Sequence, residues 1–289
     1  MIVSASYRTD IPAFYGDWFR RRLAAGHVEV RNPYGGPATR VRLDPEAASG
    51  FVFWTRNAGP FLPVLDGLAR AGRPFMVQFT VTAYPRVLEP KVPAPEPALA
   101  QIRELAARFG PGVVVWRYDP VLFSAATDAR FHRETFQRLA DGVAGAVDEV
   151  VMSAATIYAK TRRNLDRAAA GTDLAWRDPE AAEKQTLLAE LAALAARRGI
   201  AASLCAQPKL TVAGTRPAAC VDVARLSAIA GRPLEARQKG NRPGCRCAES
   251  RDIGAYDTCP HGCVYCYAVT KRETAQRAFR RHDPAAARL

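Results

Sequence analysis

Seven cysteines are the residues of this sequence best suited to chemistry, and all of them lie in its last third. Residues 1–204 contain none. The first residues, Met1–Ser6, carry no basic stretch before their apolar residues, which is unlike a secretory signal. An odd number of cysteines in a reducing compartment argues against a disulfide framework and favours thiolate ligands. The clustering therefore indicates a metal site.

The tightest group is Cys259-Pro260-His261-Gly262-Cys263-Val264-Tyr265-Cys266, which places three thiols in the pattern Cys-x-x-x-Cys-x-x-Cys. Soft thiolates at such short spacing select zinc or an iron–sulfur cluster. A structural zinc ion needs a fourth ligand, which His261 could supply, but such sites favour paired knuckles with two to four residues in each half. Three local thiols suit better a [4Fe–4S] cluster with one iron uncovered. We expect His261 to be a turn residue of this loop rather than a ligand.

The other four cysteines provide what a fully ligated cluster requires. We predict that they hold a second, auxiliary [4Fe–4S] cluster. A four-cysteine zinc site and unrelated buried thiols are the alternatives, although Cys-x-Cys is short for a standard zinc knuckle. The four residues are Cys205, Cys220, Cys245 and Cys247.

The first two thirds of the chain must position this chemistry, and they alternate between short apolar runs and helical patterns. Continuous apolar runs such as Phe51–Trp54 are typical of parallel strands buried on both faces. The predicted strands are Ile2–Ser6, Val28–Arg31, Gly50–Thr55, Phe75–Thr82, Val113–Arg117, Glu149–Ala154 and Ile200–Cys205. Helical spacing of apolar residues predicts helices over Pro97–Phe109, Ala129–Val147 and Pro179–Arg198.

This alternation predicts an α/β fold, best fitted by a (β/α) barrel over residues 1–234. The eighth strand is not legible, so the barrel is expected to be incomplete or circularly permuted. Residues 235–244 are polar and rich in turn formers, and they lead into a cysteine-bearing segment, 235–289, that packs on the barrel mouth. No glycine-rich dinucleotide fingerprint or phosphate loop is present, which disfavours a doubly wound sheet.

Polar residues follow several predicted strands, where the active sites of such barrels assemble. Gln78 and Arg117 interrupt or end runs that should be apolar. The candidates for contacts with substrate or cofactor are Arg8, Asp10, Arg117, Asp119 and Lys160.

The cysteine octapeptide, with an aromatic residue just before its last cysteine, resembles the cluster loop of the radical S-adenosylmethionine superfamily, closest to its spore-photoproduct-lyase-like branch. Over nearly its whole length the chain is also similar to a bacterial family named domain of unknown function 1848, which supplies no activity. The matching segments are Ser4–Pro12, Phe53–Asn57, Trp116–Pro120 and Ser250–Cys259.

The superfamily resemblance implies a specific chemistry. Cys259, Cys263 and Cys266 would hold three irons of a [4Fe–4S] cluster, and the fourth iron would bind S-adenosyl-L-methionine. Reductive cleavage would give a 5′-deoxyadenosyl radical that abstracts hydrogen from a substrate the sequence does not identify. An electron donor such as flavodoxin or ferredoxin is implied, and the branch makes a nucleotide or nucleic acid a candidate target. The cofactor would be cradled by strand-end residues and one loop tyrosine: Ser4, Ser6, Thr55, Asn57, Gln78 and Tyr265.

One departure from the superfamily pattern is that its cluster loop follows the first strand, whereas here it begins at Cys259. In a closed barrel the last strand pairs with the first, so a loop near the end of the chain can reach the same place. We therefore predict a circularly permuted arrangement in which the loop covers the strand ends from the C-terminal side. A non-catalytic iron–sulfur or zinc protein that binds a ligand or partner is the alternative function.

The formal charge of +13 is carried mostly by arginine and supports a nucleic-acid partner only if it is focused on one surface. No run approaches the ~18 apolar residues of a membrane helix. We expect a soluble cytoplasmic protein, with His132 and His282 on its surface and a basic helix over Lys271–Arg281.

Overall fold

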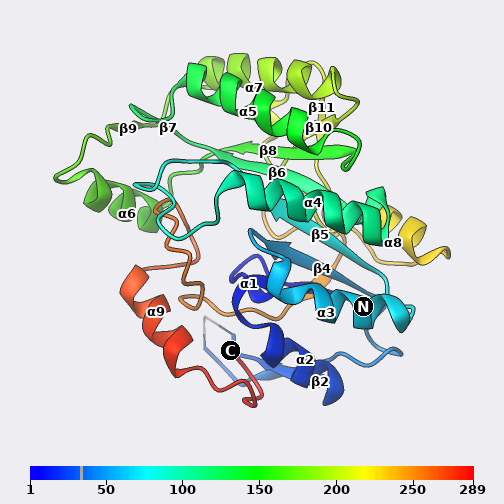
Figure 1. Cartoon of the computed structure of the whole chain (residues 1–289). Helices are drawn as coiled ribbons and strands as arrows, with labels where there is room; N and C mark the ends of the chain where they lie inside the picture. The colour runs from blue at the N-terminus through cyan, green and yellow to red at the C-terminus, as the bar shows by residue number, and fades with distance from the viewer. Residues whose placement is uncertain (33–34) are drawn as a thin grey trace.

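Eight strands form one sheet in which every neighbouring pair is parallel. The structure is a computed structural model, and it describes residues 1–32 and 35–289. The spatial order is β11-β10-β8-β6-β5-β4-β1-β12 (Figure 1). The strands are β1 (Ile2–Ala5), β4 (Gly50–Thr55), β5 (Phe75–Thr80), β6 (Val114–Val121), β8 (Glu149–Ala154), β10 (Ala201–Leu204), β11 (Thr215–Pro217) and β12 (Ser250–Asp252).

The sheet has two edges, because β11 and β12 do not pair with each other within the described residues. The backbone nevertheless bridges them. Ala248 donates its N–H to Val221 O at 2.9 Å, just beyond β11, and two residues later Ser250 pairs with Ile2 of β1. Because no strand pairing joins β11 to β12 in the described residues, the sheet does not close into a complete barrel. As predicted, the last strand lies parallel beside the first.

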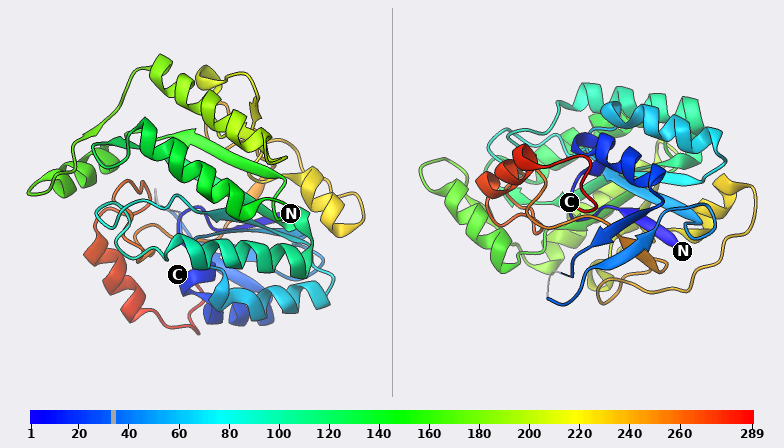
Figure 2. Two further views of the ribbon diagram at one scale, coloured as in Figure 1. Left: turned by 45° about the horizontal axis from the view of Figure 1, so that its top comes forward. Right: turned by 90° about the horizontal axis from the view of Figure 1, so that it is seen from below.

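The helices of the crossovers pack on the outer face of the sheet (Figures 1 and 2). Their apolar stripes explain this, since α4 buries Leu99, Ile102 and Leu105 at helical spacing. Asp128 begins α5 by accepting the N–H of Phe131. These helices are α2 (Gly16–Ala24), α3 (Leu62–Arg70), α4 (Pro95–Phe109), α5 (Ala129–Val143) and α7 (Ala181–Ala196).

The inner face of the sheet has its own apolar core. Side chains alternate along each strand, so one residue in two points inward. The short helix α8 (Val223–Ala230) packs Leu226 against this inner layer. The layer also includes Cys220 and Cys247, and its strand residues are Ile2, Val52, Met76, Val115 and Val151.

One strand prediction was wrong about its place in the fold. The run predicted at 28–31 forms β2 (His27–Val30), which pairs antiparallel with β3 (Thr39–Arg42) in a separate two-stranded sheet. Only Val28 of β2 is buried, whereas β4, β5 and β8 of the main sheet are buried on both faces. The remaining elements are β7 (Phe123–Ser124), β9 (Trp176–Arg177), α1 (Ile11–Phe14), α6 (Ala159–Ala169), α9 (Arg272–Arg281) and three 3₁₀ turns at Gly59–Phe61, Pro111–Val113 and Pro208–Leu210.

The segment predicted to pack on the barrel mouth also contributes a strand, since β12 lies within residues 235–289. After β12 the chain forms the cysteine loop and then α9. Helices α6 and α9 lie at the same end of the sheet (Figures 1 and 2). Across the described part of the chain, no helix is both long enough and apolar enough to pass through a membrane.

Candidate functional site

The cysteine loop, defined here as residues 258–267, lies beyond the carboxyl end of β12 and contacts α6. The side chain of Thr161 donates to Tyr265 O at 3.4 Å, and Asn164 Nδ2 donates to Val269 O at 3.2 Å. Cys266 N–H bonds back to Cys263 O at 3.1 Å, which makes a tight turn between the last two thiols. The loop thus occupies the end of the parallel sheet at which active sites assemble.

The three cysteines of the loop form no disulfide bond, and each is partly exposed to solvent. Burial raises the pKa of Cys259 well above its usual value, and Asp10 together with the thiols of Cys266 and Cys263 adds to that shift. Burial also raises the pKa of Cys263 to about 12, against the opposing effect of the Arg56 guanidinium. Burial raises the pKa of Cys266 as well, so a metal bound by these thiols would have to displace their protons.

Asp10 links the cysteine loop to the start of α1 and to the carboxyl end of β4. Its Oδ1 accepts from Ala13 N at 2.9 Å and from Thr55 Oγ1 at 2.7 Å. Its Oδ2 accepts from Arg56 N at 2.8 Å and lies 2.8 Å from His261 Nε2. Asp10 is therefore a positioning residue whose oxygens are fully committed. Tyr15 adds a second tie by donating its hydroxyl to Thr258 O at 2.7 Å.

His261 has both ring nitrogens next to protein partners. Nε2 faces Asp10, and Nδ1 lies 3.4 Å from the carbonyl of Lys91. The ring packs edge-on against Phe14 at a centroid distance of 4.6 Å. It thus serves to hold the loop, as the sequence predicted, and neither nitrogen points at the thiols as a free ligand.

A buried charged network lies behind Cys263. Arg56 bonds Glu89 Oε1 at 2.9 Å and donates to Tyr265 OH at 2.6 Å. Thr82 donates to Glu89 at 2.6 Å, and the Tyr265 hydroxyl also contacts that carboxylate. Tyr265 fastens the loop to this network, and its contact with a cofactor stays a prediction. The sequence analysis did not select Arg56 or Glu89, although Arg56 lies in one of the segments that carry the family resemblance.

Asp252 organises the end of β1. Its two carboxylate oxygens accept from Ser4 Oγ at 2.9 Å and Ser6 Oγ at 2.7 Å, and from Tyr7 N at 3.0 Å. Arg8 pairs with Oδ1 at 2.9 Å and reaches the Asp252 carbonyl at 3.0 Å. Ser4, Ser6 and Arg8 therefore converge on a carboxylate of β12, one of the two edge strands that the sequence did not reveal, and their contacts with a cofactor or substrate stay predictions. The signal that could have found it is the same Ser250–Cys259 segment.

The second set of cysteines lies near the other edge of the sheet. Cys220 Sγ lies 3.6 Å from Cys205 Sγ. Arg117 donates to Cys220 Sγ at 3.0 Å and to Gln78 Oε1 at 3.1 Å. Gln78 in turn donates to Cys220 O at 2.9 Å. The polar residues that interrupt strands β5 and β6 thus hold a cysteine in place.

Asp119 completes that group, since its carboxylate pairs with Arg117 and accepts from Ser153. Arg117 and Ser153 lower the pKa of Asp119, although burial opposes the shift. Asp119 is therefore an anion that neutralises a buried guanidinium.

Aromatic and basic side chains lie between the two cysteine sets. Trp54 packs edge-on against Tyr7 at 6.2 Å, and the Arg117 guanidinium lies 5.0 Å from the centre of the Trp54 ring. Lys160 Nζ lies 5.2 Å from the centre of the Tyr256 ring, and Arg8 lies 5.5 Å from the same centre. Lys160 and Arg8, both predicted to contact the substrate or cofactor, therefore lie beside the same aromatic ring, that of Tyr256.

Asn57, predicted to contact the cofactor, accepts from Gln101 Nε2 in the middle of α4 at 2.9 Å and from Gly59 N at 3.3 Å, so it ties the turn after β4 to that helix. One histidine prediction was wrong. His132 lies on a helix but is fully buried, not on the surface, and burial lowers its pKa to about 4. His282 is half-buried against Tyr15, at a ring distance of 4.9 Å.

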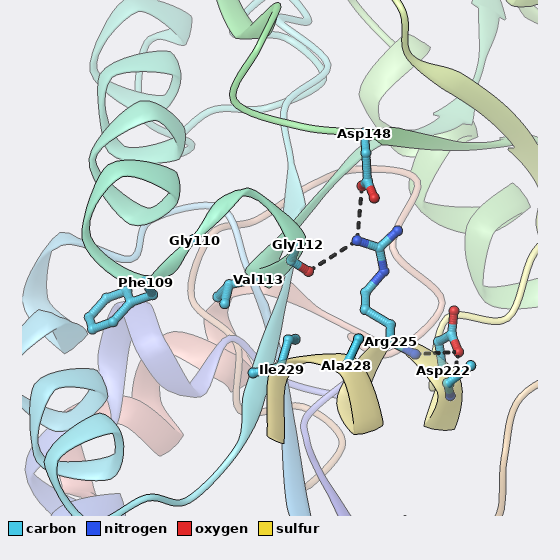
Figure 3. Close-up of a pocket in the computed structure, with 10 residues that line it drawn as sticks. Phe109, Gly110, Gly112, Val113, Asp148, Asp222, Arg225, Ala228 and Ile229 are labelled. Atoms are coloured by element: carbon cyan, nitrogen blue, oxygen red, sulfur yellow. Dashed lines mark hydrogen bonds and ion pairs between the residues drawn. The ribbon is translucent and has the colours of Figure 1, made fainter. Parts of the chain in front are cut away.

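A cavity of about 600 Å³ lies at the opposite end of the sheet, before β6 and β8 and beside α8 (Figure 3). Its central charged group, Arg225, donates to Gly112 O at 3.0 Å and pairs with Asp148 and Glu149, each at 2.9 Å. These bonds hold α8 to the base of the sheet, so we assign the cavity a structural role.

The seven thiols lie in two groups, but neither group is closed around a single centre. Among residues 1–32 and 35–289, no three His, Cys, Asp or Glu side chains already surround one point as the ligands of one metal ion do. The loop thiols and the second set therefore have to be judged by donor chemistry and by pairwise contacts.

Comparison with known proteins identifies a family but no activity. The family model described as domain of unknown function DUF1848 matches residues 2–268. No curated protein matches the chain. Among solved structures, one entitled crystal structure of D-hydantoinase aligns with 9% identity and a TM-score of 0.32, and the alignment covers 71% of this chain and 41% of that chain. The chain thus spans less than half of that protein, and so low a score establishes no shared fold.

Proposed function

The chain belongs to the family of domain of unknown function DUF1848, which assigns no activity, and from the resemblance of its cysteine loop to the radical S-adenosylmethionine superfamily we propose an enzyme that binds a [4Fe–4S] cluster through Cys259, Cys263 and Cys266 and uses S-adenosyl-L-methionine for radical chemistry. When bound and reduced, such a cluster cleaves the sulfonium of S-adenosylmethionine and supplies a 5′-deoxyadenosyl radical for hydrogen abstraction. The substrate class stays open, with a nucleotide or nucleic acid as one candidate and a small reductase such as flavodoxin or ferredoxin as the electron donor.

The observation that carries the proposal is the ligand count of the cysteine loop. A single tetrahedral ion in a structural site takes four protein ligands. The loop offers three thiols, and the one other donor within it, His261, has its nitrogens facing Asp10 and the Lys91 carbonyl. A centre held by three thiolates keeps one position open, which is what a reactive centre needs and a structural one avoids.

The residues around the loop are suited to hold a charged centre away from water. Arg56 places a buried positive charge near Cys263, where it favours the thiolate and would stabilise the extra electron of a reduced centre. Asp10 and Tyr15 fix the loop to α1, and Tyr265 fixes it to Glu89. Positioning by buried hydrogen bonds of this kind holds ligands in one geometry.

The other predicted cofactor contacts act indirectly. Ser4 and Ser6 are bonded to Asp252, Thr55 to Asp10, and Gln78 to the backbone of Cys220. They shape the carboxyl ends of β1, β4 and β5. We assign contact with the cofactor or the substrate to Arg8 and Lys160, whose cationic groups flank Tyr256 beside the loop. Asp252 already pairs with Arg8, so a carboxylate or phosphate at this position would be attracted mainly by Lys160.

The proposal is tested with anaerobically reconstituted protein incubated with dithionite and S-adenosylmethionine. We expect 5′-deoxyadenosine to form, and replacement of Cys259, Cys263 or Cys266 by alanine to abolish it together with loop-bound iron. Arg20→Ala, which changes only an exposed ion pair with Asp17 on α2, is the matched preparation control. Absence of the product, together with a tightly held zinc ion in the loop, would instead favour the alternative function, a non-catalytic metal protein.

A further inference from the structure

The second set of cysteines lies where the two edges of the open sheet are joined. Cys205 directly follows β10, Cys220 comes shortly after β11, and Cys247 shortly precedes β12. The backbones beside Cys220 and Cys247 touch, because Val221 accepts the N–H of Ala248 at 2.9 Å and donates its own N–H to Cys247 Sγ at 3.3 Å. These thiols therefore sit across the one seam that strand pairing leaves open.

The four cysteines lie in one packed cluster. Cys205 Sγ and Cys220 Sγ are 3.6 Å apart, Cys247 Sγ accepts the N–H of the residue after Cys220, and Cys205 and Cys245 pack against the same inner layer. All four are free thiols. A separation of 3.6 Å is far longer than a disulfide bond of about 2.05 Å. It is close to the ~3.8 Å that separates two sulfurs of one tetrahedral ion with metal–sulfur bonds of about 2.3 Å.

Three of these sulfurs also accept N–H donors, so groups that can stabilise thiolate ligands are already in place around them. Arg117 donates to Cys220 Sγ at 3.0 Å, Arg242 Nη2 lies 3.4 Å from Cys205 Sγ, and the backbone of Val221 donates to Cys247. Arg242 and Arg117 thus place positive charge beside the sulfurs, although Asp119 already pairs with Arg117. Charge-assisted bonds of this kind stabilise and orient metal ligands from outside the coordination shell.

From this geometry we infer that Cys205, Cys220, Cys245 and Cys247 hold one tetrahedral zinc ion that closes the seam between β11 and β12. A four-iron cluster places each thiolate on a different iron, so its sulfurs stand farther apart than the pair measured here. Tetrahedral sites with four sulfur ligands suit zinc, which binds more tightly than ferrous iron in the same site.

To bind one ion tetrahedrally, the sulfurs of Cys205 and Cys245 have to approach each other. Cys220 and Cys247 are buried and fixed, whereas Cys205 and Cys245 are half-buried and have room to adjust. Cys245 lies in the irregular stretch between α8 and β12, where backbone movement costs little ordered structure.

The site would act as a structural brace, because zinc has no redox chemistry of its own. The ion would connect the residues after β10 and β11 to those just before β12. Asp252 of β12 in turn positions Ser4, Ser6 and Arg8. The inference does not depend on the cluster proposed for the loop.

The test uses the full chain in which Cys259, Cys263 and Cys266 are all replaced by alanine, so that any remaining metal belongs to the second set. After expression with zinc and iron supplied and anaerobic purification, we expect about one zinc per chain and almost no iron. Adding Cys220→Ala should lower the zinc content at least tenfold. Cobalt exchanged into the triple variant should show the intense thiolate charge-transfer and visible bands of a tetrahedral cobalt–sulfur site.

Two results would overturn the inference. About four irons per chain in the triple variant would mean that the second set holds a cluster. A folded triple variant with no bound metal and no tetrahedral cobalt spectrum would mean that it holds none. Either result is independent of whether the wild-type chain forms 5′-deoxyadenosine, so failure of this inference and failure of the proposed function can be told apart.

Discussion

Replacing Asp10 by asparagine should destabilise the protein and loosen the cysteine loop. Each carboxylate oxygen of Asp10 accepts two donors: Ala13 N and Thr55 on one side, Arg56 N and His261 on the other. The amide has nearly the same shape, but its NH₂ group faces two donors whichever way it is turned. Two bonds to a charged acceptor are therefore lost. At about 1.5–3 kcal/mol each, the free energy of unfolding should fall by about 3–6 kcal/mol.

The assay is urea unfolding of the reduced protein under anaerobic conditions, combined with the rate at which a thiol reagent labels Cys259. We expect a lower midpoint and faster labelling. Asp17→Asn, which removes an exposed carboxylate beside Arg20 and Arg21, is the matched control and should change neither. A double-mutant cycle with His261→Phe isolates the contact to the loop. A loss below about 1 kcal/mol with unchanged labelling would refute the assigned role of Asp10, because it would mean that fewer than two such bonds were lost.

Two further predictions concern the barrel itself. Nε2 of His132 lies 3.0 Å from Leu122 O, so it carries the proton, and Nδ1 accepts from Tyr118 OH. Burial lowers the pKa of His132 from 6.5 to about 4. As the pH falls, the unfolded state therefore binds the proton near pH 6.5 and the folded state only near pH 4. Stability should therefore be complete above pH 6.5 and fall by about 3 kcal/mol by pH 4, an increment that His132→Gln should remove in acid unfolding curves. Gly254→Ala should cost about 1–3 kcal/mol and weaken iron retention, because its Cβ would lie 2.6 Å from Ser6 Cβ; Gly67→Ala, with open space around it in α3, should be neutral or stabilising in the same melts.

The main strands were predictable because burial on both faces leaves a strong pattern. Gly50–Thr55 and Glu149–Ala154 were predicted with the bounds that the structure gives to β4 and β8. The two edge strands were not, because β11 and β12 are three residues each and are only partly buried. A strand of that length carries no periodicity of its own, and its pairing is decided by partners far away in the sequence.

The site was predictable in its residue types and only partly in its partners. Cysteine spacing and clustering identified both sets, whereas Gln78 and Arg117 were predicted as contacts of cofactor and substrate and not as partners of Cys220. The roles of Asp10 and Tyr265 were not predictable, because each depends on a contact between residues about 170 to 250 positions apart. His132 misled for the same reason, since a polar residue on a helix reads as exposed until its buried partners, Tyr118 and Leu122, are placed beside it.

The position of the cysteine loop at the end of the chain follows from the parallel pairing of β12 with β1. In a sheet of this kind the loops after all strands open at the same end, so the loop after β12 reaches the same region as a loop after β1. Asp252 on β12 bonds Ser4, Ser6 and Arg8 after β1, which makes the two strand ends one unit. The order of elements along the chain can therefore change while the arrangement of the site is kept. In this chain the last strand, β12, is only three residues long and so forms few strand hydrogen bonds. The zinc ion inferred between β11 and β12 would stabilise the sheet beside this short strand.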